Sequence, residues 1–119
     1  MNFQQQIVSF NNMYGMPVSS EPSTKNLGVP LLQRLIDFKI ILNKELVEVD
    51  DIIINLEGSS PKTELETLTE LADWLGDIQV YCASEMAKLG IPLNETLSAI
   101  MDSNFSKMGA DGKPIYDGN

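Results

Sequence analysis

Acidic side chains recur at helical spacing in two segments of this sequence. Glu45 and Glu48 lie three residues apart in KELVEVDD, and Asp51 follows after the same interval. The second group, in TELADWLGD, consists of Glu70, Asp73 and Asp77. On a helix, these spacings place the carboxylates of each group toward one side, where like charges repel each other.

Such an acidic face, taken alone, is typical of solvated helix surface in an acidic protein. Both groups, however, are interleaved with apolar side chains such as Leu46, Val49 and Leu75, which predicts a position beside a helix–helix contact. Like charges are unfavourable there unless a cation bridges them. Oxygen ligands favour Mg²⁺ or Mn²⁺ over zinc or copper, and substrate phosphates commonly complete a Mg²⁺ site. The pattern therefore indicates a divalent-metal site for a phosphate compound.

Composition narrows the remaining chemistry. The 119 residues contain no histidine, which excludes histidine-based triads and histidine-ligated zinc and argues against Glu-x-x-His di-iron sites. A net charge of −9 argues against a nucleic acid polymer as partner. Neither a long apolar run nor a secretory signal pattern occurs, so no membrane association is expected. The single Cys82, interpreted as a packing residue, favours a reducing compartment, and we expect a cytoplasmic protein.

Helical segments must position the acids. Apolar spacing and breaker residues predict helices over 2–14, 31–57, 63–89 and 93–107. Residues 15–30 are predicted to form a surface loop, and residues 109–119 a C-terminal arm or weak hairpin with Asp-Gly turns at 111–112 and 117–118. No strand pattern alternates with the helices, so one all-α domain over 1–119 is expected. Its broad apolar faces predict a homodimer or homotetramer.

Two further pairs of side chains have types suited to nucleotide binding. No glycine-rich phosphate loop occurs, so phosphates would be held by metal and by isolated side chains. Asn104 and Lys107, at the end of the fourth helix, are the candidates for sugar or base and for phosphate. A lysine there also complements the helix dipole. Trp74 and Tyr81 are interpreted as core residues rather than base-stacking residues.

The order of these features resembles the MazG-like superfamily of all-α nucleoside triphosphate pyrophosphohydrolases, which includes phosphoribosyl-ATP pyrophosphatases and dimeric dUTPases. The likeness rests on Glu-x-x-Glu in one long helix, ELAD followed by WLGDIQVY in the next, and a later SNFSK. It extends from FNNMYGMP to SKMGADGKPI and is closest to the small single-domain members. It implies a four-helix bundle completed by oligomerisation, and Mg²⁺-dependent cleavage of a nucleoside triphosphate to the monophosphate and pyrophosphate.

The resemblance also implies roles by position. The metal ligands would be Glu45, Glu48, Glu70 and Asp73, with Asp77 as a further acidic position. Glu45 and Glu48 are the catalytic candidates, and the substrate-binding candidates are Asn104, Lys107 and Lys44. Many members carry two adjacent Glu where this chain has Lys44 and Glu45. The general base therefore stays open between Glu45, Asp77 and activation of water by the metal alone.

Two other functions fit the same residues. The chain could be a helical oligomer that binds nucleotide as a regulator or scaffold, with Lys44 marking a lost catalytic base. It could also be a plain helix-bundle interaction protein, whose acidic faces are solvated surface and bind no metal. Base and sugar preference depend on the shape of a pocket that residue spacing does not define.

Overall fold

The computed structural model describes residues 1–58 and 61–115, and over these ranges it is all-helical, as expected. The helices are α1 (Phe3–Met13), α2 (Leu31–Glu57), α3 (Glu64–Leu89) and α4 (Leu93–Phe105). Each predicted helix is confirmed, with ends that differ from the prediction by no more than two residues. Across the described part of the chain, no helix is long and apolar enough to cross a bilayer.

Local side-chain chemistry explains where the helices begin and end. The Asn2 side chain accepts a hydrogen bond from the Gln5 backbone N–H at 2.9 Å and starts α1. Thr63 and Glu66 form the equivalent reciprocal cap at the start of α3. Gly90 ends α3 with a φ of 68°, a left-handed conformation that costs glycine little.

Residues 15–30 form the predicted loop, and the loop lies against the C-terminal end of α3. The Ser19 backbone N–H donates to the Ala87 carbonyl at 3.0 Å. A Cβ atom on Gly90 would overlap the backbone carbonyl oxygen of Glu21. Gly90 therefore serves both to end the helix and to admit the loop.

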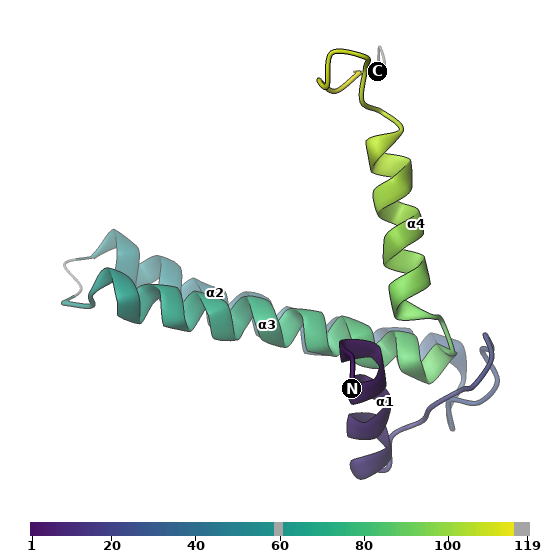
Figure 1. Ribbon diagram of the computed structural model, residues 1–119. Coiled ribbons are helices and arrows are strands. Elements are labelled where there is room, and N and C mark those ends of the chain that lie inside the picture. The colour runs from purple at the N-terminus through teal and green to yellow at the C-terminus, as the bar shows by residue number, and fades with distance from the viewer. Residues whose placement is uncertain (59–60, 116–119) are drawn as a thin grey trace.

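The helices form an open arrangement rather than a closed bundle. Figure 1 shows α2 and α3 side by side as a long hairpin, with α1 crossing α3 near its C-terminal end. From that same end, α4 projects away from the hairpin (Figure 1). Ile7, Ala83 and Leu93 form a small buried cluster where α1, α3 and the start of α4 meet.

The chain exposes far more surface than a compact monomer, and many of its large apolar side chains are exposed. Its radius of gyration is 18.4 Å, whereas a compact domain of this length has about 13.5 Å. Its accessible surface is 8841 Å², against about 6,400 Å² for a folded monomer of this mass. Cys82, interpreted from sequence as a packing residue, is exposed on this surface. Few of the predicted apolar stripes are covered within one chain.

The C-terminal segment contains the predicted weak hairpin in its described part. Met108 and Pro114 form an antiparallel bridge, and the Gly109 N–H donates to the Lys113 carbonyl at 2.7 Å. Gly112 has a φ of 77° at the predicted Asp-Gly turn. The second predicted turn, at 117–118, lies outside the described residues.

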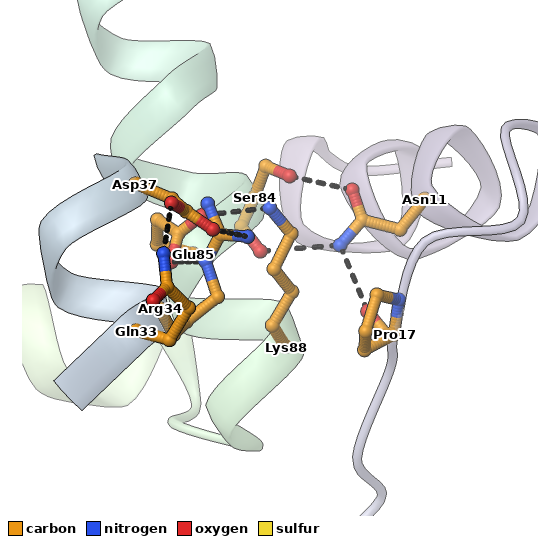
Figure 2. A network of polar contacts seen from close by, with 8 residues as sticks. All are labelled: Asn11, Pro17, Gln33, Arg34, Asp37, Ser84, Glu85 and Lys88. Atoms are coloured by element: carbon orange, nitrogen blue, oxygen red, sulfur yellow. Dashed lines mark hydrogen bonds and ion pairs between the residues drawn. The ribbon is translucent and has the colours of Figure 1, made fainter. Parts of the chain in front are cut away.

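A buried asparagine joins α1 to α3. Asn11 is fully buried; its Nδ2 donates to the backbone carbonyls of Ser84 at 3.1 Å and Pro17 at 3.3 Å. Its Oδ1 accepts from the Ser84 hydroxyl at 2.7 Å (Figure 2). The Asn11 amide therefore provides hydrogen-bond partners for three buried polar groups where α1 packs on α3. The sequence pattern did not indicate this role.

The Asn11→Ala variant is expected to lose about 2–3 kcal/mol of unfolding free energy, because these buried polar groups lose their partner. Urea denaturation followed by circular dichroism measures the loss. The matched control is Asn12→Ala, since Asn12 is exposed on the same helix. Equal stability of the two variants would show that the Asn11 contacts contribute nothing net.

Candidate functional site

Carboxylates from both long helices line one open pocket. The pocket has a volume of about 330 Å³ and lies between the facing sides of α2 and α3, toward the turn that joins them. Its lining comprises Glu48, Asp51, Ile52, Asn55, Lys62, Glu70, Asp73, Trp74 and Asp77. We call this the acidic pocket. The two acidic groups predicted from sequence are therefore brought together, which helical spacing alone could not establish.

Glu45 lies deepest among the acids of this region. Only 4% of its surface is exposed, and its Oε2 atom has no hydrogen-bond partner among the described residues. Burial is the main cause that raises the pKa of this carboxyl, and the neighbouring Glu48 and Asp77 raise it further. The nearby Tyr81 hydroxyl opposes part of that rise in pKa. A buried acid with an unpartnered oxygen is suited to a cation.

Trp74 links the two helices at this point. Its indole N–H donates to the backbone carbonyl of Glu45 at 2.8 Å, which fixes α3 against α2 beside the buried acid. The sequence interpretation of Trp74 and Tyr81 as core residues is wrong for Tyr81, which is 36% exposed. Tyr81 instead lies at the surface, and its own pKa is raised by burial of the hydroxyl and by the nearby charge of Glu45.

The acidic pocket also contains residues that the sequence analysis did not assign to it. Lys62, just before α3, forms an ion pair with Glu70 across the pocket. Asn55 lies seven residues after Glu48 on α2, so helical periodicity could have placed it on the same side. Helical periodicity could not have placed Lys62 in the pocket, because Lys62 lies between α2 and α3 and not within a helix.

The substrate-binding candidates lie elsewhere. Asn104 and Lys107 are at the far end of α4, and neither lines the acidic pocket of its own chain. Figure 1 shows this end of α4 well separated from the α2–α3 hairpin. Lys44 is exposed on α2 and does not line the acidic pocket either.

The donor chemistry of the acidic pocket fits a hard divalent cation. The charged acceptors that line it are all carboxylates. Glu45 does not line the pocket, but its buried Oε2 atom lacks a partner and its charge acts on Glu48 and Asp77 of the pocket wall. Within residues 1–58 and 61–115, however, no three side chains already surround a common point in metal-binding geometry. Glu48, Asp73 and Asp77 are exposed, so their side chains are not held in one rotamer by packing.

Comparison with known proteins adds no family assignment: no family model matches this sequence, and no curated protein is significantly similar to it.

Proposed function

We propose that this protein is a Mg²⁺-dependent nucleoside triphosphate pyrophosphohydrolase that releases pyrophosphate and a nucleoside monophosphate. One observation carries the proposal: carboxylates from α2 and α3 line a single pocket, next to a buried glutamate with an unpartnered oxygen. Mn²⁺ is the alternative cofactor. We place the activity in the cytoplasm, in keeping with the reduced cysteine.

The residues divide into distinct roles in this proposal. Glu48, Glu70 and Asp73 face the acidic pocket and would hold the cation, with Glu45 behind them. When bound, Mg²⁺ would neutralise the negative charge of the triphosphate and orient it for in-line attack by water. Asp77 faces the same pocket and would accept the proton of the attacking water. Glu70 must first exchange its contact with Lys62.

Lys44 does not weaken this assignment. Its side chain is exposed and does not line the acidic pocket, so a lysine at this position removes no carboxylate from the pocket wall. The same geometry gives Lys44 no direct role in holding substrate within one chain.

We further propose that a second copy of the chain completes the bundle. The accessible surface exceeds that of a compact monomer by about 2,400 Å², whereas a standard interface buries about 800 Å² per partner. An isolated helix of α4's length is marginal in water, yet four large apolar side chains of α4 are at least 47% exposed: Leu97, Ile100, Met101 and Phe105. Packing α4 on another protomer would cover this face and carry Asn104 and Lys107 toward that protomer's acidic pocket.

A charge on the apolar face of α4 is expected to break this assembly. Ile100→Asp should convert the oligomer to monomer and reduce pyrophosphate release by at least tenfold, because burying an unpaired carboxylate at an interface is costly. Light scattering coupled to size-exclusion chromatography measures the mass. Ala99→Asp is the matched control, because Ala99 is exposed on the opposite side of α4, and it should remain oligomeric. A wild type that is already monomeric would contradict the assembly.

The test of the catalytic proposal is pyrophosphate release from a panel of canonical and modified nucleoside triphosphates, with Mg²⁺ or Mn²⁺ present and absent. Metal-dependent release from at least one nucleotide is expected. The nucleotide-binding scaffold is the second candidate. Metal-dependent nucleotide binding without release would select the scaffold, and no metal binding would select a plain interaction protein.

A further inference from the structure

A second hollow lies further along α3 than the acidic pocket, toward the C-terminal end of that helix. It has a volume of about 420 Å³ and lies where α1 faces α2 and α3. Aromatic rings contributed by three segments make up much of its wall: Phe10, Tyr14, Phe38 and Tyr81. We call it the aromatic pocket. Tyr81 links the two sites, because it lines the aromatic pocket while its hydroxyl lies near the charges of Glu48 and Asp77, which line the acidic pocket.

One wall of the aromatic pocket is a buried polar network. Glu85 and Lys88, each no more than 7% exposed, line the pocket together with Ser84. Glu85 accepts from Arg34 at 3.0 Å and from Lys88 at 2.7 Å. Figure 2 shows these side chains clustered beside the Asn11–Ser84 contact. These contacts hold the wall in place. The negative charge of Glu85 is balanced by the positive charge of Lys88, whereas acids outnumber bases in the acidic pocket.

The two neighbouring hollows thus differ in chemistry. One presents carboxylates suited to a cation with phosphates, and the other presents aromatic faces around a charge-balanced polar wall. A nucleotide carries the same two chemistries, a polyphosphate at one end and a flat neutral ring at the other. A volume of about 420 Å³ lies in the range of small-ligand pockets, and aromatic side chains stack on any base.

We propose that the aromatic pocket receives the base of the nucleotide whose phosphates occupy the acidic pocket. This inference rests on the proposed function for the placement of the phosphates. The lining hydroxyl of Ser84 and the carboxylate of Glu85 already have partners within the protein. Stacking, chiefly by Tyr14, Phe38 and Tyr81, is therefore the main source of base affinity.

Tyr14→Ala tests this placement. Tyr14 is 64% exposed, so its removal leaves the core intact. Met13→Ala is the matched control. Met13 directly precedes Tyr14, is 70% exposed and does not line the pocket. Calorimetry with Mg²⁺ compares α,β-methylene nucleoside triphosphates, which resist cleavage, with inorganic tripolyphosphate, which has no base. Tyr14→Ala should weaken nucleotide binding about tenfold and leave tripolyphosphate binding within twofold, while Met13→Ala alters neither.

Metal-free titration with nucleosides separates this inference from the proposed catalytic function. If the wild type binds nucleosides and Tyr14→Ala does not, the base pocket stands even when no pyrophosphate is released. Absence of nucleoside binding to the wild type, or equal weakening of nucleotide and tripolyphosphate in Tyr14→Ala, would overturn it. A change of oligomeric mass in Tyr14→Ala with unchanged nucleotide affinity would also overturn it, because the pocket would then be an interface between copies.

Discussion

Pyrophosphate release by the Glu48→Ala variant is expected to fall at least about 100-fold below that of the wild type. Glu48 faces the acidic pocket, and a ligand that neutralises the charge of a triphosphate contributes several kcal/mol to the transition state. Each 1.36 kcal/mol corresponds to about a tenfold change in rate. Release is measured at saturating Mg²⁺ with the best nucleotide of the panel.

The matched control for this prediction is Asp50→Ala. Asp50 is an exposed acid on the same helix that does not line the acidic pocket, and its removal changes the net charge by the same amount. Its activity should stay within about twofold of the wild type, because exposed charges contribute little at a distance. If both variants lost activity equally, the effect would come from overall charge and not from the pocket.

The Glu45→Gln variant is expected to be more stable than the wild type in metal-free buffer at neutral pH, by about 1–3 kcal/mol of unfolding free energy. The substitution removes a buried negative charge beside Glu48 and Asp77. Glutamine keeps the size of the side chain and carries no charge. Thermal denaturation with and without Mg²⁺ measures the effect. Mg²⁺ should stabilise the wild type more than the variant.

The pH dependence of stability follows from the same carboxyl. Because the pKa of Glu45 is raised in the folded state above its ordinary value of 4.5, the folded protein binds the proton more tightly than the unfolded chain. Its contribution to stability is therefore full below pH 4.5 and is lost as the pH rises through the folded-state pKa. Glu45→Gln should lack this decline. Identical pH profiles for wild type and variant would contradict the burial of a titrating acid at this position.

Helix ends were largely predictable because they depend on neighbours in sequence. Thr63 with Glu66 and the glycine at 90 are caps that act within one turn of the helix ends. The acidic faces were predictable for the same reason, since helical periodicity places Glu45 near Glu48 regardless of what surrounds the helix. The all-α character of the described residues follows from these local preferences.

The orientation of α4 relative to the other helices could not be predicted from residues close in sequence. Its apolar spacing predicts a helix, but the same spacing suits a face packed within the chain and one left for a second copy. The positions of Asn104 and Lys107 relative to the acidic pocket depend on that orientation, so the sequence named candidates without placing them. Asn11 and Lys62 were missed because their partners are distant in sequence or lie outside a regular helix.

The sequence by itself determined the helices, their acidic sides, the absence of histidine chemistry and the loop over 15–30, since each follows from residue types and short-range spacing. Only the tertiary structure decided that Glu45 is buried with an unpartnered oxygen, that Trp74 donates a hydrogen bond to its backbone carbonyl, and that Tyr81 lines the aromatic pocket. These features depend on how α2 and α3 align against each other. That alignment is set by packing summed over both helices, which no local pattern encodes.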